Sequence, residues 1–261
     1  MLVLIKLGGS LITDKRVERS LRKTVVIQLA DEIHSALSVR PDLKIVIGHG
    51  SGSFGHFAAS QNNTIAGVHT EDQWRAFAHV ATVAAELNYL VGELLVDAGL
   101  PVWRIQPSAS ALSKDGELDR LNIAPIQAAL DHNLIPVVYG DVSLDELRGG
   151  TIISTEKIFH YVAYHLPVDQ ILLLGEVEGV YDVQGIVIPE ITPSNYPAIQ
   201  ASLGGSAGVD VTGGMETKVS DMLSLVRAKP NLGIRIMDGK SEGLLESTLL
   251  GTTNPGTLIH I

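Results

Sequence analysis

Short hydrophobic runs alternate with longer amphipathic segments along most of the chain. The runs are rich in β-branched residues and end at Gly, Pro or polar residues, so they predict buried strands at residues 2–7, 44–47, 102–105, 135–139 and 171–174. Hydrophobic residues at helical spacing predict helices at about residues 23–38, 72–98, 123–131 and 155–166. This alternation predicts an α/β fold, a three-layer αβα sandwich with a mainly parallel central sheet.

A turn-rich stretch at residues 175–185 is the best candidate for an internal boundary. After it we expect a loop at about 193–208, a helix at 214–228, a strand at 234–237, a short helix at 243–249 and a terminal strand at 257–259. We therefore predict an amino-terminal lobe, residues 1–174, and a carboxyl-terminal lobe, residues 175–261. The two lobes are expected to share one continuous sheet as a single structural domain.

Composition narrows the classes of function. The 261 residues carry a formal net charge of -10, which argues against a nucleic-acid-binding surface. The absence of cysteine excludes disulfides, thiolate metal sites and a Cys nucleophile, and it fits a reducing compartment. The first hydrophobic run is interrupted by Lys6, and no apolar run approaches the roughly 20 residues that span a bilayer. We expect a soluble, cytoplasmic protein.

Three glycine-containing segments have the composition of parts of one anion-binding site. They are residues 6–10 (Lys-Leu-Gly-Gly-Ser), 50–56 (Gly-Ser-Gly-Ser-Phe-Gly-His) and 212–218 (Thr-Gly-Gly-Met-Glu-Thr-Lys). Small residues let backbone N–H groups approach a phosphate closely, and each segment adds a residue that carries charge or donates hydrogen bonds. Charge neutralisation and positioning are most of what phosphoryl transfer needs, so the segments indicate a kinase.

Each segment also has a simpler interpretation. Lys6 closes the first predicted strand, and a Gly-Gly turn with a solvated lysine would look the same. Lys218 lies about one turn into a predicted helix, where a bound phosphate would meet both the helix dipole and the ammonium. A capped helix with an exposed lysine is the alternative. His56 could donate a hydrogen bond to an anionic acceptor, although an isolated histidine more often caps or fills a helix start.

Residues 50–55 also match the dinucleotide fingerprint G-x-G-x-x-G. A nicotinamide-binding fold needs a second strand with an acidic end about 20 residues later. Residues 71–79 are polar and helical instead, so an oxidoreductase is disfavoured, and no Walker A sequence is present. The histidines show no metal-site spacing, since His160 and His165 are five residues apart.

Two carboxylates follow predicted strands. Asp141 comes after a strand and Gly140, and Glu156 opens a helix after a polar cap. Either could orient the lysines or reach Mg²⁺ through water. For Glu156, an ordinary acidic residue in the first turn of a helix is the alternative.

In their order along the chain, the motifs resemble those of the amino acid kinase superfamily and are most similar to the isopentenyl phosphate kinases. The motifs are Lys-x-Gly-Gly-Ser, Gly-x-Gly-Ser-Phe-Gly-His, Pro-Val-Val-Tyr-Gly-Asp-Val, Glu-Gly-Val-Tyr-Asp and Val-Thr-Gly-Gly-Met-x-x-Lys, and the resemblance covers residues 2 to about 259. It implies the amino acid kinase fold, an acceptor-binding first lobe and an ATP-binding second lobe. It further implies transfer of the ATP γ-phosphoryl group to isopentenyl phosphate with Mg²⁺, and a homodimer joined through an amino-lobe helix.

Site residues follow from the resemblance by matching position. Catalytic roles are implied for Lys6, Lys15, Lys218, His56 and Glu156. ATP contacts are implied for Gly8, Gly9, Ser10, Gly179, Tyr181, Asp182, Gly213, Gly214 and Lys218. Acceptor contacts are implied for Gly52, Ser53, Gly55, His56, Gly140 and Asp141. No residue is assigned to direct metal coordination.

One departure from the family pattern is informative. The chain has Ser154-Thr155-Glu156 where the family commonly has Ser-Gly-Asp. Either Glu156 replaces the aspartate with shifted geometry, or the acceptor or the efficiency differs. Two alternatives therefore stay open: a kinase of the same fold for another small anion, such as a phosphonate or an acyl phosphate, and a non-catalytic nucleotide- or anion-binding domain. Retention of all three lysines argues against the second.

Overall fold

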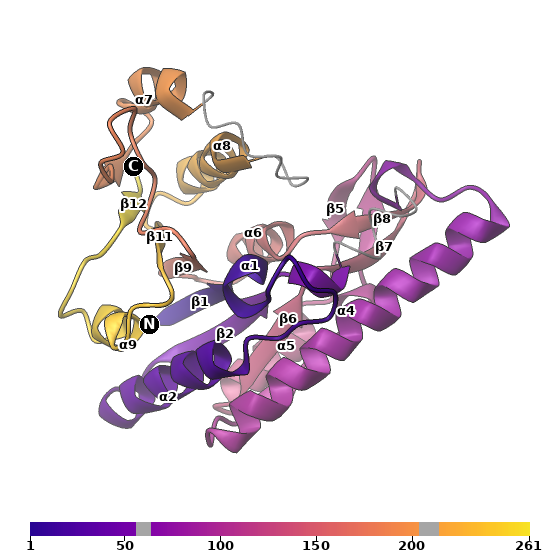
Figure 1. Cartoon of the computed structure of the whole chain (residues 1–261), viewed down its shortest axis with the longest axis horizontal. Coiled ribbons are helices and arrows are strands. Elements are labelled where there is room, and N and C mark those ends of the chain that lie inside the picture. Colours follow the sequence, from indigo (N-terminus) through magenta and orange to yellow (C-terminus); the bar gives the residue numbers. More distant parts are fainter. Residues whose placement is uncertain (56–63, 204–213) are drawn as a thin grey trace.

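The computed structural model describes residues 1–55, 64–203 and 214–261, and it is built around an eight-stranded sheet (Figure 1). Its strands are β1 (Leu2–Leu7), β2 (Lys44–His49), β3 (Val102–Arg104), β6 (Ile135–Tyr139), β9 (Gln170–Gly175), β10 (Glu190–Ile191), β11 (Gly233–Asp238) and β12 (Thr257–Ile259). They lie in the order β10-β12-β11-β9-β1-β2-β6-β3. All neighbours pair in parallel except β11 and β12, which are antiparallel.

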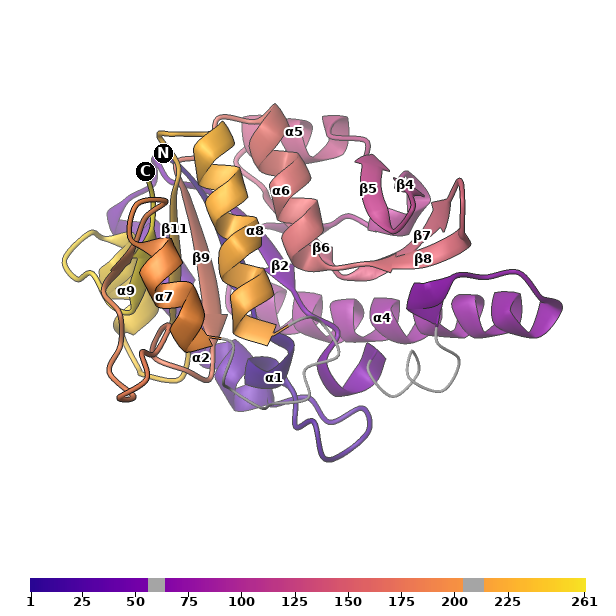
Figure 2. The same cartoon turned by 90° about the horizontal axis from the view of Figure 1, so that it is seen from above.

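Helices cover both faces of this sheet (Figure 2). They are α1 (Gly9–Ile12), α2 (Lys23–Val39), α4 (Glu71–Asp97), α5 (Ala124–Asp131), α6 (Thr155–His165), α7 (Tyr196–Leu203), α8 (Gly214–Ala228) and α9 (Leu244–Leu249). Alternate side chains of a strand point to opposite faces, so Val3 and Ile5 pack with α2, α4 and α9. Leu2 and Leu4 pack with α5, α6 and α8. The predicted mainly parallel αβα sandwich is confirmed.

The element predictions were wrong in one segment and incomplete in another. Within the loop expected at 193–208, the structure has helix α7 (Tyr196–Leu203). Pro197 lies in the first turn of this helix, where proline is tolerated because its missing N–H has no intrahelical partner. The sequence also gave no signal for the two-residue strand β10 or for a separate small sheet.

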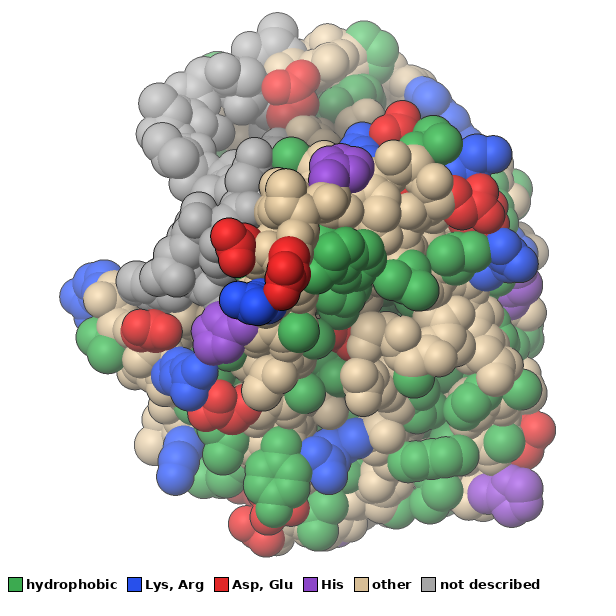
Figure 3. Space-filling view, turned by 90° about the vertical axis from the view of Figure 1, so that its right-hand side faces the viewer, with side chains coloured by type: hydrophobic (Ala, Val, Ile, Leu, Met, Phe, Trp, Pro, Cys, Tyr) green, Lys and Arg blue, Asp and Glu red, His purple; other side chains and the backbone are tan. Residues whose placement is uncertain are grey.

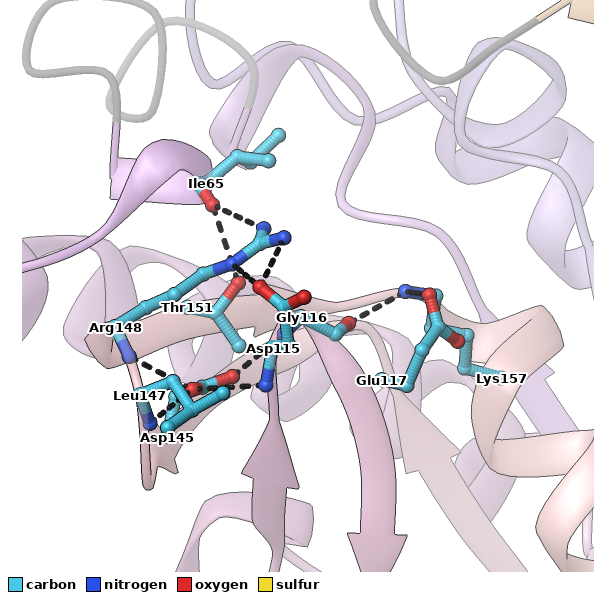
Figure 4. Close-up of polar contacts among 9 residues, drawn as sticks. All are labelled: Ile65, Asp115, Gly116, Glu117, Asp145, Leu147, Arg148, Thr151 and Lys157. Carbon is cyan, nitrogen blue, oxygen red and sulfur yellow. Dashed lines mark hydrogen bonds and ion pairs between the residues drawn. The ribbon is translucent and has the colours of Figure 1, made fainter.

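The small sheet contains β4 (Leu112–Lys114), β5 (Glu117–Arg120), β7 (Asp141–Asp145) and β8 (Gly149–Ile153), in the order β5-β4-β7-β8. The carboxylate of Asp145 accepts hydrogen bonds from the backbone N–H groups of Asp115, Gly116, Leu147 and Arg148, at 2.7–3.1 Å (Figure 4). The Arg148 side chain bonds to Asp115 and reaches the Ile65 carbonyl oxygen. One buried carboxylate therefore joins the turns that connect the four strands.

The small sheet lies at the end of the molecule opposite β12 (Figure 1). Trp74 on α4 and Leu144 and Leu147 of the β7–β8 hairpin are exposed hydrophobic side chains. The space-filling view of this end shows hydrophobic side chains interspersed with charged side chains of both signs (Figure 3).

The main sheet runs without interruption through both predicted lobes, because β9 pairs with β1 on one side and with β11 on the other. The division at residues 174 and 175 stays a prediction. Among the described helices, none is both long and apolar enough to cross a membrane.

Candidate active site

The carboxyl ends of three neighbouring strands bring the first two glycine segments together. Leu7 at the end of β1 pairs with His49 at the end of β2 and with Leu174 near the end of β9. The turns that follow these strands therefore meet at one edge of the sheet, which is where ligands of parallel sheets bind. The Gly8 N–H donates to the Leu174 carbonyl at 2.9 Å, which fixes the first turn against β9.

The two glycine turns contact each other through their backbones. A Cβ atom on Gly9 would lie 2.6 Å from the Gly52 nitrogen, and one on Gly50 would lie 2.9 Å from the Gly9 nitrogen. Gly52 also has a φ of +48°, a conformation that L side chains rarely adopt. Buried Thr13 links the turns, since its hydroxyl donates to the Gly9 carbonyl at 2.7 Å and accepts from the Ser53 N–H at 2.8 Å. Glycine is required here for close approach of the backbones.

Glu156 reaches this edge from the first turn of α6. Ser154 caps the helix by accepting from the Lys157 N–H, and the Thr155 hydroxyl donates to the His49 carbonyl at 2.6 Å. A Cβ atom on Gly48 would lie 2.6 Å from the Thr155 side chain, so α6 packs closely on β2. These contacts place the Glu156 carboxylate against the Lys6 ammonium in an ion pair.

The charge state of Glu156 is set by lysines. Burial by itself raises its pKa, but the positive charges of Lys6 and Lys218 and the hydrogen bond from Lys6 outweigh burial and lower the pKa to about 2. The carboxylate is therefore ionised at any physiological pH. The longer side chain in place of aspartate still pairs with a predicted catalytic lysine, so the departure from the family pattern preserves the charge arrangement.

A cavity of about 240 Å³ lies between these elements. Many of the predicted site residues line it, namely Lys6, Gly8, Gly9, Ser10, Lys15, Gly52, Gly140, Glu156, Gly214 and Lys218. They come from the ends of β1, β2 and β6 and from the starts of α1, α6 and α8, and Figure 2 shows the beginning of α8 near α1. Residues predicted as separate motifs thus form one cavity, which is lined by three lysines and by the backbone of the glycine turns.

Some predicted residues lie elsewhere. Buried Ser53 accepts from the Ser20 N–H, and Gly55 packs on Ser51 within the same short helical turn. The carboxylate of Asp141 is buried and accepts from the N–H groups of Ser108 and Val142. These partners give Asp141 a structural role in the described state, and its acceptor contact stays a prediction.

The predicted nucleoside contacts lie in the turn after β9 and also do not line the cavity. Gly179 packs against Thr257, and the Tyr181 hydroxyl accepts from the Glu178 N–H at 3.2 Å. Asp182 accepts from the N–H groups of Gln184 and Ile186. Contacts of these residues with ATP stay a prediction. His56 and Gly213 lie outside the described residues.

The structure adds residues that the motifs did not indicate. Asp221, one helical turn after Lys218 on α8, lines the same cavity, and burial raises its pKa. The spacing Lys-x-x-Asp puts both on one helix face and could have identified it. His49, next to Gly50, is fully buried between the Asn88 amide and the Tyr139 ring. Burial lowers its pKa to about 4, so it supports the glycine turn as a neutral side chain.

Comparisons with known proteins agree with this geometry. The sequence profile of the amino acid kinase family matches residues 1–238. Isopentenyl phosphate kinase from Haloferax volcanii is 34% identical over 260 residues, covering 99% of this chain and 98% of the relative. Isopentenyl phosphate kinase from Methanocaldococcus jannaschii is 30% identical over 262 residues, covering 96% of each.

A solved structure of isopentenyl phosphate kinase superposes with a TM-score of 0.83 at 27% identity, covering 99% of this chain and 100% of the other. The match of a kinase family along most of the chain, together with the motifs and the fold, excludes the oxidoreductase interpretation of residues 50–55. The chain belongs to the amino acid kinase family and, within it, to the isopentenyl phosphate kinases.

Proposed function

We propose that the protein transfers the γ-phosphoryl group of ATP to the phosphate of isopentenyl phosphate, which gives isopentenyl diphosphate and ADP. The observation that carries this proposal is the single cavity in which Lys6, Lys15 and Lys218 meet the glycine turns. The relatives from Haloferax volcanii and Methanocaldococcus jannaschii, at least 30% identical over nearly the whole chain, are isopentenyl phosphate kinases, which supports the acceptor.

The chemistry requires mainly charge neutralisation. The acceptor phosphate oxygen is already anionic, so direct attack on the γ-phosphorus needs no strong base and no covalent intermediate. Repulsion between the acceptor and ATP is the main barrier that the protein must offset, and lysine ammonium groups stabilise the developing charge on the transferred group. Glu156 holds Lys6 in place through their ion pair. Backbone N–H groups of the glycine turns supply further donors for phosphate oxygens.

Mg²⁺ is proposed to enter with ATP and to be held by the phosphate oxygens. Among the described residues, no group of three or more His, Cys, Asp or Glu side chains is arranged to hold a metal ion. The carboxylates that line the described cavity belong to Glu156 and Asp221. They suit contacts with water ligands of the ion, and the ion would supply charge neutralisation of the phosphates.

We also propose a cytoplasmic homodimer that buries part of α4 and the edge strand β3. Tyr89, Val96 and Trp103 are exposed hydrophobic side chains on these elements, and the Arg104 guanidinium lies 4.7 Å from the centre of the Tyr89 ring. Light scattering on the wild type and on Trp103→Glu tests the interface. A dimer that becomes monomeric in the variant supports it, and a wild-type monomer contradicts it.

The function is tested by ADP release with Mg-ATP and a panel of acceptors: isopentenyl phosphate, dimethylallyl phosphate, fosfomycin, acetylglutamate, UMP and no acceptor. Turnover that depends on isopentenyl phosphate supports the proposal. ADP release with another acceptor alone would keep the kinase chemistry and reassign the acceptor. No acceptor-dependent release would favour a non-catalytic nucleotide-binding protein.

A further inference from the structure

Arg22 makes a pair of contacts that join two walls of the active-site cavity. Its guanidinium donates to the Ser10 carbonyl oxygen at 3.0 Å and to the Glu176 carboxylate at 2.7 Å. Ser10 lines the cavity from the turn after β1. Glu176 follows β9 directly, between Gly175 and Val177, which line the cavity from the other side. The two walls belong to the two predicted lobes.

The contact with Ser10 satisfies a group that helix α1 cannot satisfy by itself. In a helix of four residues, the last carbonyl oxygens have no intrahelical donor. The Arg22 backbone N–H donates to the Ile12 carbonyl at 2.7 Å, and its side chain donates to the Ser10 carbonyl. A positive charge at this end also interacts favourably with the helix dipole. Arg22 thus caps the carboxyl end of α1, whose amino end begins at the glycine turn.

The contact with Glu176 holds this cap against β9. The Glu176 and Arg22 side chains are 37% and 32% exposed, so solvent weakens their attraction as a simple ion pair. The pair acts by fixing position, because one guanidinium nitrogen of Arg22, Nη1, donates to a carbonyl oxygen and to a carboxylate at the same time. The Gly175 carbonyl next to Glu176 accepts from the Gly239 N–H at 2.9 Å, so the β9 side of the link is itself fixed by β11.

We propose that Arg22 and Glu176 are positioning residues that hold the Gly8–Ser10 turn in its phosphate-binding conformation and thereby set the affinity for the nucleotide. The inference rests on the proposed use of this cavity for ATP. It assigns no direct contact with substrate to Arg22. It distinguishes the nucleotide from the acceptor, since the link joins the walls made by the β1 and β9 turns, and the predicted acceptor residues follow β2 and β6.

The test is the dissociation constant of ADP, measured by calorimetry on Arg22→Met and Glu176→Gln. Loss of both Arg22 side-chain hydrogen bonds should weaken ADP binding roughly tenfold, the effect of losing hydrogen bonds to a charged group. Glu176→Gln should weaken it by about threefold, and the double variant should match Arg22→Met because both changes break one link. This readout needs no acceptor, so it holds whichever acceptor the kinase uses.

The Michaelis constant of isopentenyl phosphate supplies the second measurement, and it should change by less than about twofold in each variant, because the two side-chain bonds of Arg22 end on Ser10 and Glu176, which are not predicted acceptor residues. Arg40→Met is the matched control: Arg40 pairs with Asp42 at 2.9 Å and is 34% exposed, and neither residue lines the cavity. Arg22→Lys keeps the charge on a shorter and more flexible side chain and should give an intermediate ADP affinity.

Three results would overturn the proposal. They are ADP affinity in Arg22→Met equal to that of Arg40→Met, additive losses in the double variant, and equal weakening of both substrates. A general loss of stability would lower the melting temperature of a variant and would not selectively weaken its affinity for ADP. Thermal unfolding of each variant therefore separates the two effects. If Arg22→Met does not fold, Arg22→Lys and Glu176→Gln give the same comparison.

Discussion

Two ionised carboxylates, Glu156 in the cavity and Asp145 in the small sheet, are stabilised by different partners. Both have a lowered pKa although burial by itself raises the pKa of each. For Asp145 the cause is hydrogen bonds from backbone N–H groups, including those of Gly116 and Arg148. For Glu156 the cause is the charge of Lys6 and Lys218.

The difference in partners distinguishes a carboxylate that stabilises the fold from one that prepares a phosphate-binding site. Neutral N–H donors satisfy the Asp145 carboxylate and add no positive charge that could bind an anion, so the arrangement can only stabilise the turns. In the cavity, three lysines face two carboxylates. Lys6 is held in position by Glu156, and the charge of the three lysines still exceeds that of the two acids, which is what an incoming phosphate requires. The predictions below test this distinction, from the largest expected effect to the smallest.

Lys218→Ala should reduce turnover most. If Lys218 stabilises the transferred phosphoryl group, its loss should lower kcat by about a thousandfold, the scale found for removal of a donor to transition-state charge. ADP affinity should fall much less, since most nucleotide contacts remain. The measurement is steady-state ADP release with isopentenyl phosphate as acceptor.

Lys229→Ala is the control for this change. Lys229 is the residue directly after α8. Its ammonium donates to the Tyr164 carbonyl at 2.9 Å, away from the cavity. Its removal should leave kcat within about twofold, as expected for surface substitutions. Equal kcat in Lys218→Ala and in the wild type would refute the proposed catalytic role of the α8 lysine.

Glu156→Gln should have the next largest effect. The amide keeps the shape but removes the charge that holds Lys6, so we expect kcat to fall by about 10- to 100-fold. Glu156→Asp keeps the charge on a side chain one methylene shorter, as in the family pattern, and should lose less. A Gln variant as active as the wild type would show that the ion pair does not position Lys6 for the reaction.

The pKa of Glu156 gives a pH dependence with a definite sign. Because the pKa is lowered to about 2 in the folded protein, its contribution to stability is present above the unfolded value. The contribution is lost as the pH falls from about 4.3, the value for an unperturbed glutamate, towards the folded value. Activity should therefore not decline between pH 8 and pH 5 through protonation of Glu156, and Glu156→Gln should reduce the loss of stability below pH 4.

The sequence predicted the centre of the main sheet well because the strands there are buried on both faces. A short hydrophobic run such as residues 135–139 is typical of a central strand of a parallel sheet, and β6 has these bounds. The glycine segments were also readable, because parallel strands of neighbouring register bring their following turns to one edge. Local signals of this kind indicated Lys6, Lys218 and Glu156, and the resemblance to the kinase family added Lys15; all four line the cavity.

The small sheet and the Arg22 link were not predictable for a shared reason. Strand β5 reads Glu-Leu-Asp-Arg and is mostly exposed, so its pairing depends on neighbours and on the Asp145 network. Arg22 and Glu176 are 154 residues apart, and nothing in the local sequence relates them. Contacts between distant polar residues depend on the assembled fold, whereas hydrophobic periodicity is a local property.

Gly9→Ala should damage the cavity through the backbone. The added Cβ would lie 2.6 Å from the Gly52 nitrogen, so the two glycine turns must separate. We expect a loss of about 1–3 kcal/mol in the free energy of unfolding, typical of overpacking, and a fall in kcat of about tenfold. Gly233→Ala is the control, because its Cβ would meet only the Leu258 side chain, at 3.5 Å. Equal effects of the two changes on kcat would contradict close contact of the turns.

Asp145→Asn should have the smallest effect on turnover and a clear effect on stability. The amide keeps one acceptor oxygen but loses the charge-assisted hydrogen bonds, so the free energy of unfolding should fall by about 2 kcal/mol. For a chain of this size that corresponds to about 4–8 °C in Tm. The stability difference should be present above about pH 4 and should shrink as the pH falls through the lowered pKa of Asp145.

The control is Asp72→Asn, since the Asp72 side chain is 96% exposed and should contribute little. Thermal unfolding and ADP release, measured on the same samples, distinguish the two kinds of carboxylate. Asp145→Asn should lose stability with kcat within about twofold of the wild type, because its partners are neutral and distant from the transferred phosphoryl group. If Asp145→Asn instead lost turnover to the extent that Glu156→Gln does, the small sheet would be part of the catalytic arrangement, and the separation between a structural and a preparatory carboxylate would be wrong.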